Sequence, residues 1–166
     1  MTALRRPSPL SAPTNPPSPA LSPLAEATGY LGLLPFLVAL LGVGLAPELG
    51  QRDFAQRLAI GYGATILAFL GAVHWGLALA RRWAWSTGLV AGAILPAVLG
   101  TAAVLSGGQK GLALLVAGFG LFWIYEHRRC GADLPPDYLR MRRNLSLAVC
   151  SMLALTMILS DSVGLR

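Results

Sequence analysis

The stretch that decides the fold runs from Leu58 to Ala80 and reads LAIGYGATILAFLGAVHWGLALA, without a lysine, arginine, aspartate or glutamate in its 23 residues. A helix needs about 20 predominantly apolar residues to cross a bilayer. Similar uncharged runs occupy 27–47, 83–109, 111–125 and 144–160. Helices are the only open structures that satisfy every backbone polar group in lipid. The sequence therefore predicts an all-α, polytopic transmembrane bundle of about five spanning helices.

The composition agrees with a membrane protein. Hydrophobic residues make up 55% of the 166 residues and charged residues 12%, about half the charged share of a soluble domain. The net charge of +6 could suit nucleic acid, but the basic residues stand between apolar blocks and not along one helix face, so a nucleic-acid interface is excluded. We expect one domain over 29–162, with spans at about 29–47, 58–80, 85–105, 108–125 and 143–160.

Residues 1–28 differ from the rest of the chain because they are rich in proline and serine. Proline removes a backbone donor and biases the residue before it away from the helix. The stretch is therefore expected to form a disordered, polyproline-like tail. The prolines also prevent the amphipathic helix that an organelle presequence presents.

The loops predict an orientation. Five spans place the tail, the turn at 81–82 and the loop at 126–143 on one side of the membrane, which we call side A, and the other loops on side B. Basic loops face the cytoplasm, or the mitochondrial matrix. We therefore expect the bacterial inner membrane, with a cytoplasmic N-terminus and a periplasmic C-terminus; the mitochondrial inner membrane is the alternative. Nine basic residues lie on side A (Arg5, Arg6, Arg81, Arg82, Arg128, Arg129, Arg140, Arg142, Arg143) and four on side B (Arg52, Arg57, Lys110, Arg166).

Aromatic residues and local motifs support this topology. The four tryptophans, at 75, 83, 85 and 123, lie near the side-A interface, where amphipathic rings are enriched. Asp53 precedes Arg57 by four residues, the favourable order for a helical ion pair. Leu134-Pro135-Pro136-Asp137 is typical of a helix start. The arginines that follow, which include Arg140 and Arg142, are expected to meet anionic lipid headgroups on side A.

His74 is the ionisable residue inside an expected span, and such residues are functional candidates. The alternative is a neutral histidine hydrogen-bonded to a neighbouring helix. A haem held by His74 and His127 is not expected, because Glu126, Arg128 and Arg129 hold His127 in the aqueous loop. Four residues of this loop are of metal-ligating types, namely Glu126, His127, Cys130 and Asp133. Their spacing matches no strong metal-binding pattern, so we interpret the loop as a solvated charged turn and not as a metal site.

The remaining features within the spans concern helix packing. Pro35 and Pro96 are each expected to kink a span. Small residues at intervals of four, as at Gly88 and Gly92, predict close helix approach. The runs contain no phosphate loop, no paired carboxylates and no nucleophile–base pair, so neither an enzyme nor a cofactor is expected.

Four stretches carry a resemblance to a known family: Tyr62–Ala78, Gly29–Phe36, the span around Pro96, and Leu134–Arg140. Together they resemble the uncharacterised membrane family of domain of unknown function 3429, which includes the mitochondrial transmembrane protein 69. The resemblance implies a small multi-pass membrane protein without an established activity. It directs attention to six residues: His74, Trp75, Pro135, Pro136, Tyr138 and Arg140.

Three hypotheses of function follow. The first is a non-enzymatic accessory, assembly or interaction subunit that acts through lipid and through other membrane proteins, because the spans are rich in small packing residues. The alternative is a small transporter or channel component that uses His74. A water-filled cavity at His74, with polar neighbours from two other helices, would favour this alternative and also a membrane enzyme, the third hypothesis. A His74 buried against apolar neighbours with one hydrogen bond would favour the accessory subunit.

Overall fold

The structure is a computed structural model that describes residues 22–131, 134–162 and 164. Over these residues it has six helices: α1 (Pro23–Leu31), α2 (Leu34–Leu45), α3 (Leu49–Leu79), α4 (Thr87–Ser106), α5 (Gly108–Cys130) and α6 (Pro136–Ser162). α1 and α2 together make one candidate membrane span, and each of α3 to α6 supplies another. The expected all-helical fold with five candidate spans is therefore confirmed.

The chain becomes helical before the end of the expected tail. The side chain of Ser22 accepts a hydrogen bond from the N–H of Ala25 at 3.2 Å, and Pro23 lies in the first turn of α1. Serine is a preferred N-cap, and the fixed φ of proline suits a first helical turn. Residues 23–28 thus belong to a helix and not to the tail, whereas residues 1–21 lie outside the described residues.

The first span is broken, not kinked, near its proline. Between α1 and α2 the chain turns at Gly32, and Pro35 lies in the first turn of α2. Proline has no N–H for the carbonyl four residues earlier, and its fixed φ suits the first turn of a helix, so Pro35 favours a new helix start here. The Tyr62 hydroxyl of α3 donates to the Gly32 carbonyl at 3.1 Å. Pro96, by contrast, lies inside α4.

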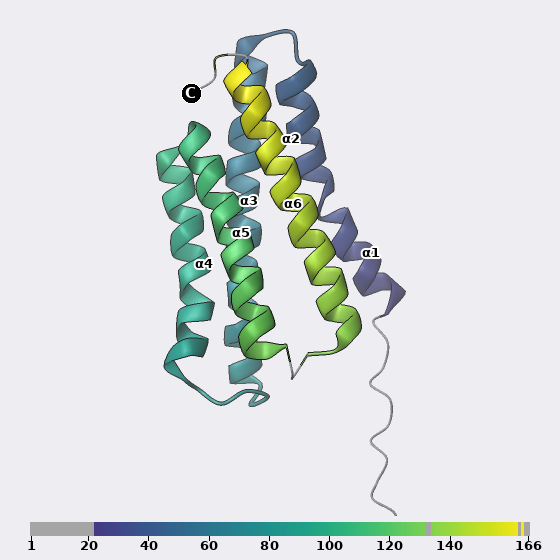
Figure 1. The fold of residues 1–166 in the computed structure, drawn as a ribbon, viewed down its shortest axis with the longest axis vertical. Coiled ribbons are helices and arrows are strands. Elements are labelled where there is room, and N and C mark those ends of the chain that lie inside the picture. Colours follow the sequence, from purple (N-terminus) through teal and green to yellow (C-terminus); the bar gives the residue numbers. More distant parts are fainter. Residues whose placement is uncertain (1–21, 132–133, 163, 165–166) are drawn as a thin grey trace, which may run out of the picture.

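The helices pack as a ring in chain order. Each of α2 to α5 contacts the next helix, α6 contacts α2, and α3 contacts α5 across the bundle. The α3–α4 and α5–α6 connections and the start of α1 lie at one end of the bundle, and the end of α6 lies at the other (Figure 1). The first end is side A of the sequence, and the second is side B.

Side B carries the extended start of α3. This helix has 31 residues, about 46 Å at 1.5 Å per residue, which exceeds the ~30 Å hydrocarbon core. In its first turns Asp53 and Arg57 form the expected ion pair at 2.8 Å.

The start of α6, at side A, also agrees with the sequence. This helix begins at Pro136 and has Asp137 in its first turn, which confirms the helix start expected there.

Small residues bring the helices close together. A Cβ on Gly100 of α4 would lie 2.9 Å from the backbone oxygen of Ala64 on α3, and one on Gly71 of α3 would lie 2.6 Å from that of Ala93 on α4. Real side chains do not tolerate such distances, so α3 and α4 pack at this separation only with glycine.

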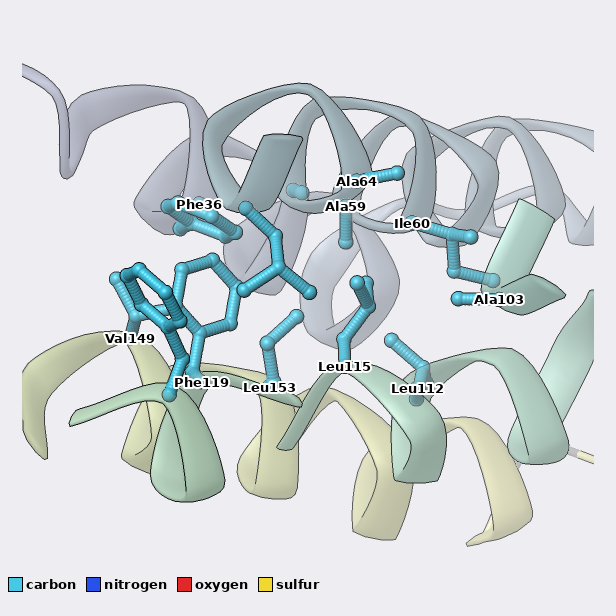
Figure 2. Packing of buried hydrophobic residues seen from close by; sticks show 13 residues of the cluster. Phe36, Ala59, Ile60, Ala64, Ala103, Leu112, Leu115, Phe119, Val149 and Leu153 are labelled. Atoms are coloured by element: carbon cyan, nitrogen blue, oxygen red, sulfur yellow. The ribbon is translucent and has the colours of Figure 1, made fainter. Parts of the chain in front are cut away.

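A continuous apolar core fills the middle of the ring (Figure 2). Leu67 of α3, Leu115 of α5 and Leu153 of α6 are each 0% exposed, and Phe36 of α2 is 1% exposed. Its thirteen buried members are Phe36, Ala39, Ala59, Ile60, Ala64, Leu67, Ala103, Leu112, Leu115, Phe119, Phe122, Val149 and Leu153. Large side chains on the outside, Phe69 and Leu105 among them, are exposed, as contact with lipid requires.

Candidate functional site

His74 lies on the inward face of α3, close to side A. The buried residues of α3 recur at intervals of three and four, and His74 follows Leu67 and Gly71 in this series. Its side chain is 1% exposed, and its Nδ1 lies 3.4 Å from the carbonyl oxygen of Leu70. His74 thus faces the interior of the bundle because it belongs to the buried face of α3.

Three aromatic rings enclose His74. The distances between ring centroids are 5.3 Å to Phe122, 5.4 Å to Trp83 and 5.9 Å to Tyr125. Phe122 and Tyr125 belong to α5, and Trp83 belongs to the α3–α4 connection. The Tyr125 hydroxyl donates to the Gly88 carbonyl on α4 at 2.7 Å. Three parts of the chain thus hold the imidazole in place.

A buried ion pair lies beside this aromatic cage. Arg142 Nε on α6 donates to Glu126 Oε2 on α5 at 2.9 Å, and the two side chains are 7% and 4% exposed. The guanidinium carbon lies 6.0 Å from the centre of the Phe122 ring. Tyr138 of α6 interacts through its hydroxyl with both partners. The pair therefore fastens α5 to α6 at side A.

The ion pair corrects two expectations from the sequence. Glu126 was expected in a solvated turn and Arg142 among arginines that meet lipid headgroups, and both side chains are buried instead. The charges of Glu126 and Arg142 also act on His74. Three ionisable side chains from three different spans therefore converge at one end of the bundle.

Two cavities meet at this cluster, and His74 and Trp83 line both. The larger, which we call the cationic cavity, has a volume of about 380 Å³. The smaller, which we call the apolar cavity, has a volume of about 270 Å³. The cationic cavity is lined by His74, Trp83, Ala84, Ser86, Leu89, Tyr125, Arg128 and Arg129. The apolar cavity is lined by Val73, His74, Leu77, Trp83, Glu126, Leu134, Pro135 and Tyr138.

The cationic cavity reaches the surface at side A, because Ala84, Ser86, Arg128 and Arg129 in its wall are exposed. Guanidinium, hydroxyl and imidazole groups around it donate hydrogen bonds, and imidazole also accepts them. Such a lining suits the reversible binding of a small polar group.

The structure brings some of the six residues singled out from the sequence to the cluster and leaves others outside. His74, Pro135 and Tyr138 line the apolar cavity. Trp75 is 43% exposed and contacts Trp85 edge to face at 5.1 Å between ring centroids. Pro136 and Arg140 take no part in the cavity walls: Pro136 is the first residue of α6, and Arg140 is exposed and paired with Asp137.

Four of the residues that surround His74 were not predicted from the sequence as functional residues, namely Trp83, Tyr125, Glu126 and Arg142. For two of them a signal was present. Glu126 continues the buried series Leu112, Leu115, Phe119 and Phe122, and Arg142 begins the series Ser146, Val149, Leu153, Thr156 and Ser160. Both series have the intervals of three and four that mark one helix face.

Among residues 22–131, 134–162 and 164, no three histidine, cysteine, aspartate or glutamate side chains gather as a metal site would require. The group considered from the sequence includes Asp133, which lies outside the described residues.

Comparison with known proteins gives one match. A family model described as a protein of unknown function (DUF3429) covers residues 21–158. No curated protein and no solved structure matches the chain.

Proposed function

Since the chain belongs to the DUF3429 family of proteins of unknown function and is a multi-pass membrane protein, we propose a function from its own geometry: a small transporter component whose ligand site is the His74 cluster. The observation that carries the proposal is the convergence of His74, Glu126 and Arg142, from three spans, beside a cavity that opens at side A. Ionisable groups within a membrane are costly and mark ligand or ion pathways.

The apolar core supports a site that is reached from one side. Leu67, Leu115 and Leu153 fill the middle of the ring between the His74 cluster and side B, and each is 0% exposed. A site that opens to one side and is closed from the other is the arrangement from which a carrier works by alternating access.

The rival function, an accessory or assembly subunit, was motivated by the small residues of the spans. Many of these are used inside the bundle itself: Tyr125 fills the space beside Gly92, Leu115 that beside Gly63, and Leu67 that beside Gly118. These three glycines therefore give little support to a partner helix, whereas Ala113 and Ala117 of α5 are exposed and leave room for one.

For the location we propose a bacterial inner membrane with side A in the cytoplasm, on the basis of the nine basic residues of side A against four on side B. The ligand site would then face the cytoplasm. A mitochondrial inner membrane, with side A in the matrix, is the alternative for the same reason.

Transport is tested with the protein in vesicles. Currents on a solid-supported membrane are recorded during concentration jumps of protons, alkali cations, carboxylates and phosphates, and detergent-solubilised protein is screened for thermal stabilisation by the same solutes. We expect at least one solute to produce a current that is lost in His74→Ala. The matched control is His127→Ala, because His127 is exposed and stacks on Trp123.

Equal behaviour of wild type and His74→Ala toward every solute would overturn the transporter proposal. A stoichiometric protein partner that is retained by both variants in mild detergent, without any current, would instead establish the accessory subunit.

A further inference from the structure

The cationic cavity is built by four segments at side A, of which α4 contributes Leu89. The α3–α4 connection contributes Trp83 and Ser86, the end of α5 contributes Tyr125, Arg128 and Arg129, and α3 contributes His74. Its volume of about 380 Å³ lies within the range of small-ligand pockets, about 300–1,000 Å³. The cavity is therefore large enough for a headgroup-sized ligand.

The charge around this cavity is positive. Among the described residues there are three ion pairs, and none of them includes Arg128 or Arg129. The buried carboxylate of the His74 cluster, Glu126, is already bound by Arg142. The guanidinium groups of the cavity wall thus have charge to offer to an anion.

The start of α4 adds to this positive charge. Ser86 caps α4 and accepts a hydrogen bond from the N–H of Leu89 at 3.2 Å, so the positive end of the helix dipole lies at the cavity. The guanidinium of Arg129 contacts Gly88 in the first turn of α4. The positive end of the α4 dipole repels the guanidinium of Arg129. An anion bound between the start of α4 and this guanidinium would be attracted by both.

The neighbourhood of the cavity fits an amphiphile. The apolar cavity shares His74 and Trp83 with it and presents Val73, Leu77 and Leu134. Trp75 and Trp85, both exposed, lie beside the same end of the bundle, and tryptophans concentrate at the depth of lipid headgroups. Basic pockets between helices at the cytoplasmic side suit phosphorylated headgroups.

We propose that the cationic cavity binds a phosphate group, presented by the headgroup of an anionic phospholipid, through Arg128, Arg129, the start of α4 and the donors of the cage. This names the ligand class of the transporter site proposed above and rests on that proposal.

The test measures binding to the full-length protein in neutral detergent by native mass spectrometry and thermal stability. The probes are phosphatidic acid, phosphatidylglycerol and phosphatidylcholine, and, as soluble phosphates, inorganic phosphate and glycerol 3-phosphate. The cavity variant is Arg128→Gln with Arg129→Gln. The matched control is Arg140→Gln with Arg143→Gln, which removes the same charge from exposed positions on the same side of the membrane.

We expect wild type to retain phosphatidic acid in preference to phosphatidylcholine, and the cavity variant to bind it about tenfold more weakly or worse, because two charge-assisted contacts are lost. The control pair should change the affinity by no more than about twofold, because Arg140 and Arg143 do not line the cavity and their charges are screened over the intervening distance. Stabilisation by glycerol 3-phosphate equal to that by the lipid would identify a soluble phosphate ester as the source of the bound group.

Equal lipid binding by the cavity variant and the control variant would overturn the phosphate site. If none of the phosphate-containing probes binds, while another solute gives a current that depends on His74, the transporter proposal stands and the phosphate site falls. If phosphatidic acid binds as expected, but neither a solute current nor the movement of labelled phosphatidic acid between the two leaflets of the vesicle depends on His74, the phosphate site stands and the transporter proposal falls.

Discussion

Removal of one partner of the Glu126–Arg142 pair should destabilise the protein strongly. We consider Glu126→Gln, which preserves the shape of the side chain and removes its charge. Arg142 would then be left with its guanidinium 7% exposed and without its partner carboxylate. Its remaining neighbours are the Phe122 ring at 6.0 Å and the Tyr138 hydroxyl, and neither neutralises a full charge.

The magnitude follows from the distance and the burial. Two unit charges 2.9 Å apart attract by about 6 kcal/mol at an effective dielectric constant of about 20. The desolvation of each ion costs several kcal/mol, so the intact pair contributes little net stability. Loss of one partner removes the attraction and leaves the desolvation of the other, which costs about 3–5 kcal/mol.

The free energy of unfolding can be measured by titration with sodium dodecyl sulfate in mixed micelles, with tryptophan fluorescence as the signal. Asp53→Asn provides the matched control, because the Asp53–Arg57 pair has a similar distance of 2.8 Å but side chains that are 40% and 76% exposed. Exposed pairs contribute only about 0.2–1 kcal/mol. Glu126→Leu combined with Arg142→Leu should unfold within about 1 kcal/mol of wild type, or be more stable, because no charge is left buried.

Two results would refute this reasoning. If Glu126→Gln unfolds within about 1 kcal/mol of wild type, water reaches Arg142 and the pair is not effectively buried. If the double leucine variant is as unstable as the single variant, the loss comes from packing and not from an orphaned charge.

Three further predictions concern packing and topology. Gly92→Ala should destabilise the bundle by about 1–3 kcal/mol, because the new Cβ would lie 2.5 Å from ring and hydroxyl atoms of Tyr125. Its control is Gly120→Ala, whose Cβ would meet nothing within 4 Å and which should be neutral in the same titration. Leu153→Ala should lower the free energy of unfolding by about 1–3 kcal/mol. This is less than in a water-soluble core, because lipid solvates leucine in the unfolded state and only the cavity cost remains. Leu155→Ala, at a position that is 49% exposed, should lower it far less. A reporter that is active only in the periplasm, fused to the C-terminus, should be active, and a cytoplasmic signal would contradict the proposed orientation.

The sequence by itself determined the spans, because the ability to cross a bilayer depends on the length and apolarity of a continuous segment, and both are local properties. It also determined the ion pair of Asp53 with Arg57 and the start of α6 at Pro136, because each depends on residues within one helical turn. Pro35 in the sequence predicted a kink in the first span, but not the turn at Gly32. That turn also depends on another helix, because the Tyr62 hydroxyl of α3 donates to the Gly32 carbonyl.

Only the tertiary structure decided the site. Glu126 and Arg142 are 16 residues apart on two helices, and each, taken alone, is a loop charge that would be expected to face water. Their pairing depends on how α5 and α6 are rotated about their own axes, and this rotation is set by the apolar series that packs Leu115 and Leu153 into one core. His74 is enclosed for the same reason. The desolvation of a buried charge is offset only when several helices bring its partners to it, and no single stretch of sequence contains that information.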